Sequence, residues 1–301
     1  MSEIVVERWV LIRATPERVW ESISTPGGLA GWFAEDVSLE PGAGGQFSFA
    51  GADVLGGGND TELLSFQPPS SLAFRWEIAG ASTLVRLCVQ PVEGAARVVA
   101  MHEVPADADL GFKSGSADGL HATWSYLLGC LKGYLELGAA PYRLRYPTPG
   151  ARTLEQSMSV AVSATEAFAA LTEPSQLDAW IGTGARVEPR AGGRFSLGWD
   201  AEERPGALGY GPSTIIDFDP GRRISYAWNA EGVPTVVQWR VEGDDTSARI
   251  TLTHSGFLGD LGTLQDYAPG WADYMQALAI YLLTGQASSG WAGSGDGIAP
   301  S

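Results

Sequence analysis

Short runs of alternating apolar and polar residues dominate the first half of the chain. Residues 4–13 alternate with β-branched and apolar side chains, which is typical of a half-buried strand. After this run, Thr15-Pro16-Glu17 has the order of a helix N-cap, a first-turn proline and an acidic first turn. Pro26 is expected to end that helix and to precede a second short one. Four further runs with a period of two predict antiparallel strands at residues 45–49, 72–78, 83–90 and 97–104.

A helical period closes this half. Apolar side chains recur three and four residues apart over more than four turns, which predicts a long amphipathic helix. Its apolar stripe consists of Leu120, Trp124, Leu127, Leu128, Leu131 and Leu135. Strands followed by a closing helix indicate an α+β unit with its helices on one face of a curved sheet, an arrangement that can enclose a cavity.

The second half repeats this pattern. At an offset of 148 residues, ten of the thirty-eight positions in residues 12–49 are identical to those in residues 160–197. Ordinary residue usage gives about two or three such matches. The match resumes at an offset of 152, which pairs Trp76 with Trp228, and ends at an offset of 151 in the closing helix. Because the order is kept throughout, the sequence indicates a tandem duplication.

The repeat and the length together predict the domain organisation. A chain of 301 residues is long enough for two domains, each with its own core. Residues 139–152 hold three prolines and three arginines without apolar periodicity, which is typical of a linker, and the carboxyl end is rich in glycine and serine. We therefore expect domain 1 at 1–138, a linker at 139–152, domain 2 at 153–285 and a flexible tail at 286–301.

Charge and composition narrow the expected partners and location. Nineteen basic residues against thirty-five acidic ones give a net charge of −16, which repels nucleic acid and anionic membrane surfaces. No basic leader followed by an apolar stretch and no apolar run of membrane-spanning length occurs in the sequence. Cys88 and Cys130 lie in apolar surroundings and are expected to be reduced thiols. We expect a soluble cytoplasmic protein without a cofactor.

The order of motifs resembles a known family. In the first half these are TPERVW, TPGGLAGWF, GGQF, FQPPSSLAFRW and TLVRL; in the second, EPSQLDAW, GGRFSL, FDPGRRISYAW, SARITLTHSGF and PGWADYMQAL. They resemble the START-like, or SRPBCC, superfamily, which is also called Bet v 1-like, and within it the family of activators of Hsp90 ATPase. The resemblance implies tandem helix-grip domains, each a curved antiparallel sheet closed by a long C-terminal helix with two short helices. It does not fix an activity, because members include lipid carriers, hormone binders, polyketide cyclases and co-chaperones.

Aromatic rings and two histidines are the candidate site residues. The rings fall on faces that can line a cavity between sheet and closing helix, although a plain hydrophobic core explains them as well. Each histidine shares a strand face with core residues, so it either contacts a ligand or is satisfied internally by a backbone carbonyl. The candidate set is Phe47, Trp76, His102, Trp124, Phe195, Trp228, Trp239, His254, Trp271 and Tyr274.

Other chemistry has little support in the sequence. Metal-ligand spacings, a nucleophile motif and a phosphate loop are not found, so no metal and no catalytic residue is predicted. The glycine pairs Gly44-Gly45 and Gly192-Gly193 precede strands and are expected to form turns. The arginines at 143, 145, 222 and 223 are interpreted as solvated loop charges, although an arginine can also hold an acidic ligand at a pocket mouth.

Three functional hypotheses follow. The first is a binding module that holds an apolar or aromatic small molecule for storage, transport or sensing. The second is an enzyme of the cyclase, dehydratase or hydrolase kind, in which His254 or His102 moves a proton. The third is a chaperone-associated module that contacts a protein partner. Of the two halves, the second keeps the family pattern more closely and is the first place to look for an open cavity.

Overall fold

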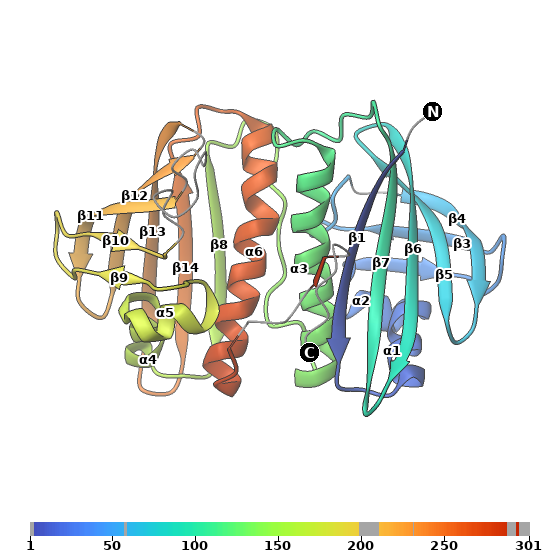
Figure 1. The fold of residues 1–301 in the computed structure, drawn as a ribbon, viewed down its shortest axis with the longest axis horizontal. Helices are drawn as coiled ribbons and strands as arrows, with labels where there is room; N and C mark the ends of the chain where they lie inside the picture. The colour runs from blue at the N-terminus through green and yellow to red at the C-terminus, as the bar shows by residue number, and fades with distance from the viewer. Residues whose placement is uncertain (1–2, 57–58, 199–210, 231, 288–292, 295–301) are drawn as a thin grey trace. The chain divides into compact units, whose positions relative to one another are not determined.

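The chain forms two units in this computed structural model, which describes residues 3–56, 59–198, 211–230, 232–287 and 293–294 (Figure 1). Unit 1 comprises Met1–Tyr146, Gln265–Asp273 and Gly290–Ser301, and unit 2 comprises Pro147–Leu264 and Tyr274–Ser289. Helix α6 (Leu261–Thr284) is thus divided between them. Most of the expected tail at 286–301 lies outside the described residues.

Unit 1 is built on an antiparallel sheet. Its strand order is β15-β1-β7-β6-β5-β4-β3-β2, and helix α3 packs against β1 and β7 (Figure 1). The elements are β1 (Glu3–Ile12), α1 (Pro16–Ser24), α2 (Pro26–Ala30), β2 (Asp36–Leu39), β3 (Gln46–Ala50), β4 (Asn59–Gln67), β5 (Ser71–Ile78), β6 (Ala81–Val92), β7 (Ala95–Pro105), α3 (Ser116–Leu137) and β15 (Gly293–Ser294).

Unit 2 repeats this order of elements in a five-stranded antiparallel sheet. The strands follow the order β11-β12-β13-β14-β8, and β9 and β10 form a separate pair (Figure 1). The elements are β8 (Thr153–Val160), α4 (Ala164–Thr172), α5 (Pro174–Trp180), β9 (Arg186–Val187), β10 (Phe195–Ser196), β11 (Gly211–Asp219), β12 (Arg223–Ala230), β13 (Val233–Gly243) and β14 (Ala248–Ser255). The α+β class expected from the sequence is confirmed.

The first helix of each unit begins where the sequence predicts. The Thr15 side chain accepts a hydrogen bond from the backbone N–H of Arg18 over 3.3 Å and caps α1. In unit 2, Ser163 accepts from the backbone of Glu166 over 3.1 Å, and the Glu166 side chain accepts in return from the Ser163 backbone over 3.0 Å. This capping box satisfies two backbone donors that the first helical turn leaves without partners.

The repeated glycine pair has a steric cause. Gly44 and Gly192 adopt positive φ angles of 81° and 76°, which side chains other than glycine rarely tolerate. At the next position, a Cβ on Gly45 would collide with the carbonyl oxygen of Glu40, and one on Gly193 would collide with that of Glu188. The expectation that both pairs form turns is therefore confirmed.

Strands β2, β4, β9, β11 and β15 were not expected from the sequence, and β15 lies in the segment expected to be a flexible tail. Strand β4 pairs with β5 through a register irregularity between Leu63 and Ser65, and Leu64 is 38% exposed. Strand β11 has two similar irregularities against β12. A bulge shifts the side chains that follow it to the other face of the sheet. The alternation of apolar and polar residues is therefore lost along β4 and β11.

Candidate functional site

A buried chain of hydrogen bonds in unit 1 joins three strands to helix α3. The indole Nε1–H of Trp124 in α3 donates to Nδ1 of His102 in β7 over 3.1 Å. Nε2 of His102 lies 2.7 Å from the hydroxyl of Thr83 in β6, which donates to the backbone carbonyl of Trp76 in β5 over 2.6 Å. All four residues are at most 1% exposed. We call these four residues the His102 relay.

The partners of His102 assign its protonation state. An indole N–H can only donate, so Nδ1 accepts and the proton of the neutral ring lies on Nε2, where it faces the Thr83 hydroxyl. Burial lowers the pKa of His102 from 6.5 to about 3. Both ring nitrogens are therefore engaged within the protein, and the neutral state is the stable one at pH 7.

Unit 2 contains the same arrangement at an offset of 152 residues. Nε2 of His254 in β14 lies 2.8 Å from the hydroxyl of Thr235 in β13, which donates to the backbone carbonyl of Trp228 in β12 over 3.1 Å. Burial lowers the pKa of His254 to about 3 as well. The ring of Phe257 packs against His254 with centroids 4.4 Å apart. The duplication has thus preserved one arrangement of three residues, which we call the frame. It consists of Trp76, Thr83 and His102 in unit 1 and of Trp228, Thr235 and His254 in unit 2.

Phenylalanine rings pack beside the His102 relay in unit 1. The centroids of Phe33 and Phe49 lie 5.4 and 5.5 Å from that of Trp76, both at steep interplanar angles. Phe74 lies 4.8 Å from Phe47 in the same edge-to-face manner. Such pairs are favourable beyond the area they bury, so they make this interior dense and well ordered.

Three of these ring positions hold aliphatic residues in unit 2. The offsets of 148 and 151 residues identify the equivalent positions, and their occupants are buried. The replacements are Ile181 for Phe33, Leu197 for Phe49 and Met275 for Trp124.

One ring is gained in exchange. Trp239 stands where unit 1 has Leu87, and its Nε1–H donates to the hydroxyl of Tyr226 over 2.9 Å. Tyr226 in turn stacks on Phe195 with centroids 4.3 Å apart. The two units therefore share a frame but fill the space around it with different side chains.

The predicted site residues are mostly buried, and they form one set of ring contacts in each unit. Of the ten, nine are at most 6% exposed, and only Tyr274 is partly exposed. In unit 1, Phe47, Trp76, His102 and Trp124 belong to one network of ring contacts. In unit 2, Phe195, Trp228 and His254 are linked through Tyr226, and Trp239 joins them by its hydrogen bond. Trp271 lies in the part of α6 that belongs to unit 1.

Sequence reasoning missed the threonines of the two frames. Thr83 is the direct cross-strand partner of Trp76, and Thr235 is that of Trp228. The offset of 152 also relates Thr83 to Thr235, so the repeat itself carried the signal. The expected partner of each histidine, a backbone carbonyl, was wrong for Nε2, because a threonine hydroxyl lies between that nitrogen and the carbonyl.

Residues 142–146, in the segment expected to be a linker, pack onto unit 1. The backbone N–H of Leu144 donates to the hydroxyl of Tyr126 over 2.7 Å, and Leu144 is buried. The guanidinium of Arg143 forms an ion pair with Asp53, whose side chain is 2% exposed. The interpretation of Arg143 as a solvated charge was therefore wrong. Its neighbour Arg145 is 73% exposed, as expected of a solvated charge.

Replacement of Asp53 by Ala is expected to lower the free energy of unfolding by about 2 kcal/mol, because it leaves a partly buried arginine without its carboxylate. The change also removes the acceptor for the backbone N–H of Glu35, now 3.1 Å from Asp53 Oδ1. Urea denaturation measures the loss. The matched control is Glu35→Gln, which breaks the exposed pair with Arg145 and should cost about 0.5 kcal/mol or less. Equal losses in the two variants would contradict the buried pairing.

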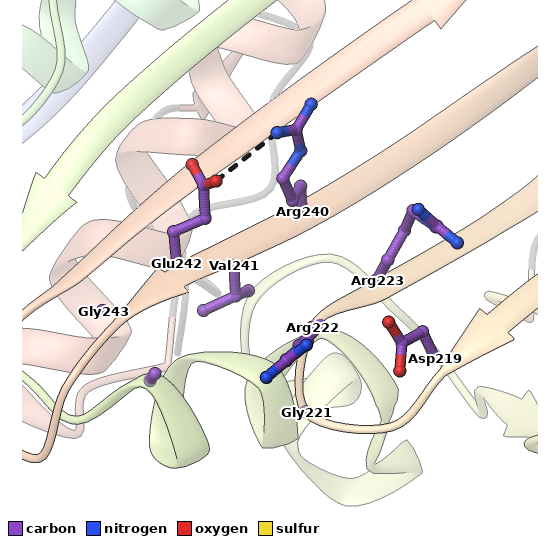
Figure 2. A pocket seen from close by; sticks show the side chains of 9 residues that line it. Asp219, Gly221, Arg222, Arg223, Arg240, Val241, Glu242 and Gly243 are labelled. Atoms are coloured by element: carbon purple, nitrogen blue, oxygen red, sulfur yellow. Dashed lines mark hydrogen bonds and ion pairs between the residues drawn. The ribbon is translucent and has the colours of Figure 1, made fainter.

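Neither of two hollows that the described residues form at the surface is lined by one of the ten predicted site residues. One of about 560 Å³ lies in unit 2 beside Arg222, Arg223 and Arg240 (Figure 2). The other, of about 350 Å³, lies in unit 1 beside Asp36 and Asp60. Across the described residues, no group of three or more histidine, cysteine or acidic side chains is placed to hold a metal ion. None of the described helices combines the length and apolar character needed to span a membrane.

No curated protein matches the chain. The crystal structure of DynU16, a putative protein in the dynemicin biosynthetic locus, is similar at 20% identity and a TM-score of 0.42, covering 91% of this chain and 97% of that one. The di-domain ARO/CYC BexL from the BE-7585A biosynthetic pathway is similar at 16% identity and a TM-score of 0.37, covering 92% and 98%. Aha1 from Colwellia psychrerythraea is 21% identical with a TM-score of 0.38, covering 45% and 98%.

The family comparison matches the chain twice. The model of the activator of Hsp90 ATPase homolog 1-like proteins matches residues 13–136 and again residues 161–283. The two matches fall on the two copies of the repeat, so the resemblance noted in the sequence is confirmed. The chain belongs to the activator of Hsp90 ATPase homolog 1-like family, whose model it matches in two tandem segments.

Proposed function

We propose that the chain binds an apolar or aromatic small molecule inside unit 2, next to Trp228 and His254, without covalent chemistry. The observation that carries the proposal is the difference between two copies of one frame. Both units keep the tryptophan, threonine and histidine, but Phe33 and Phe49 of unit 1 become Ile181 and Leu197 in unit 2. Three ring positions of unit 1, Phe33, Phe49 and Trp124, hold smaller side chains in unit 2 and one, Leu87, holds the larger Trp239, so the net change favours unit 2 as the copy with room for a ligand.

The polar groups of unit 2 suit recognition of a mostly apolar molecule. Phe195, Tyr226 and Trp228 supply flat apolar surfaces, and the Tyr226 hydroxyl and the His254 frame are polar groups among them. Apolar walls with a few fixed polar groups are the usual composition of small-molecule sites. Unit 1 then serves as the filled copy that retains the fold.

Proton transfer is the weaker alternative. An efficient general base has a pKa near the working pH, and burial holds the pKa values of His102 and His254 at about 3. Nε2 of each ring also faces a threonine hydroxyl rather than open space. These observations favour binding over a cyclase-like or hydrolase-like reaction.

Transfer of the unit 1 phenylalanines into unit 2 tests the proposal. The double variant Ile181→Phe, Leu197→Phe is expected to weaken binding of the neutral fluorescent probe N-phenylnaphthylamine at least about 10-fold, because the added rings occupy the ligand's space. The reciprocal control is Phe33→Ile, Phe49→Leu in unit 1, which should leave the affinity of the wild-type site unchanged. Probe emission measures binding, and the thermal transition checks folding of each variant. Absence of saturable binding to the wild type, or equal affinity in the double variant, would refute the proposal.

A further inference from the structure

The 560 Å³ hollow of unit 2 is lined by three arginines. Arg222 lies in the turn before β12, Arg223 begins β12, and Arg240 lies on the neighbouring strand β13 (Figure 2). Two carboxylates, Asp219 and Glu242, also line the hollow. Three cations in one place are notable in a chain with a net charge of −16. The volume is within the range of about 300–1,000 Å³ that is typical of small-molecule sites.

Two of these arginines lie side by side on neighbouring strands. Arg223 and Arg240 are direct cross-strand partners, and like charges in that position are destabilising. Each of the two has one carboxylate partner. Arg223 donates through Nε to Asp217 over 2.7 Å, and Arg240 donates through Nη1 to Glu242 over 3.4 Å. Each guanidinium has five N–H donors, so most of them remain for another acceptor.

Arg222 adds a third cation, held by its backbone. Its N–H donates to the carbonyl of Asp219 over 3.0 Å, and its own carbonyl accepts from Val241 over 2.8 Å. Its guanidinium makes no hydrogen bond or ion pair with the part of the chain that the structure describes. The turn therefore fixes an arginine at the hollow without using its charge.

Unit 1 shows that the fold does not require these charges. The same two backbone bonds occur there at an offset of 152, from Ser70 to Gln67 and from Val89 to Ser70, each 2.8 Å long. The facing cross-strand pair is Ser71 and Cys88. An uncharged sequence thus builds the same turn and strand pair, so the three arginines are a feature of unit 2 that its backbone does not explain.

We propose that this hollow binds the oxyanion of a small molecule, a carboxylate or a phosphate group, between the cross-strand pair Arg223 and Arg240, with Arg222 also lining the hollow. The planar guanidinium fork matches both groups and forms paired, charge-assisted hydrogen bonds with them. An anion there offsets the repulsion between the two facing arginines. The site is separate from the apolar interior of unit 2, and this inference does not depend on ligand binding at His254.

Titration followed by amide NMR tests the site in the full chain. Sodium phosphate and sodium benzoate are added separately, and sodium chloride at equal ionic strength measures screening alone. We expect saturable shifts of the amides of residues 219, 221–223 and 240–243 with phosphate or benzoate, and the tighter of the two identifies the anionic group. Chloride should not saturate these shifts. The equivalent amides of unit 1, at residues 67, 70, 71 and 88–90, should not respond.

Variants then assign the binding to the arginines. Arg222→Ser with Arg223→Ser installs the unit 1 residues on the same turn and is expected to weaken binding at least about 10-fold. Arg240→Gln is the second variant and should weaken it similarly, whereas Arg249→Ser, on β14 of the same unit, should not. The proposal is overturned if neither anion gives saturable shifts, if chloride reproduces them, or if both arginine variants bind as tightly as the wild type.

Discussion

Acidification from pH 7 to pH 5 is expected to lower the free energy of unfolding by about 2 kcal/mol for each of His102 and His254. Burial lowers the pKa of both from 6.5 to about 3, so below pH 6.5 the unfolded chain takes up protons that the folded chain excludes. The free energy of unfolding is therefore not reduced by these histidines above pH 6.5, and it falls progressively as the pH is lowered from 6.5 toward 3. Asp273 opposes it by about 1 kcal/mol, because burial raises its pKa to about 6 and favours protonation of the folded state.

Urea denaturation at pH 7, 6 and 5 measures this dependence. The variants His102→Gln and His254→Gln keep a polar group beside the threonine but remove the titration, so each should flatten the pH dependence by about 2 kcal/mol between pH 7 and pH 5. A wild-type stability that is constant from pH 7 to pH 5, or an unchanged slope in both variants, would contradict the assignment of neutral buried histidines.

Replacement of Trp124 by Ala is expected to cost about 3–5 kcal/mol of unfolding free energy. The indole is fully buried, lies 6.1 Å from both the Trp76 and the His102 rings, and donates the hydrogen bond to His102 Nδ1. The substitution removes ring contacts, leaves a cavity and leaves a buried acceptor unsatisfied. Urea denaturation at pH 7 provides the measurement.

Trp124→Phe separates packing from hydrogen bonding. Phenylalanine keeps most of the ring volume and loses only the donor, so a smaller cost of about 1–2 kcal/mol is expected. A loss below about 1 kcal/mol for Trp124→Ala would show that the His102 relay does not stabilise unit 1.

The fold could be predicted mainly because the chain contains it twice. Thr15 and Ser163 mark the same helix start by the same chemistry, and the glycine pairs at 44–45 and 192–193 occupy turns that exclude a side chain. A local signal that recurs at a fixed offset is more specific than either copy alone. The long helix α3 was predictable from its apolar stripe, since packing of one face decides helix formation.

The interior could be predicted only in part. Periodicity placed His102 and Trp76 on one face of the sheet, but the bond from Trp124 joins a helix to a strand and depends on tertiary packing. Arg143 could not be assigned to Asp53, because 90 residues separate them and each is ordinary in its local sequence. The sequence contains the difference between the units, since Ile181 and Leu197 replace Phe33 and Phe49. Only the structure shows that these positions lie beside the shared frame.

The central claim is that one frame was copied and that the second copy has room for an apolar molecule. A crystal structure under xenon pressure tests this most directly, because xenon enters dry apolar cavities and needs no knowledge of the natural ligand. The account predicts xenon beside Trp228 and His254 in unit 2, and none beside Trp76 and His102 in unit 1. Xenon in unit 1 alone, or in neither unit, would contradict it.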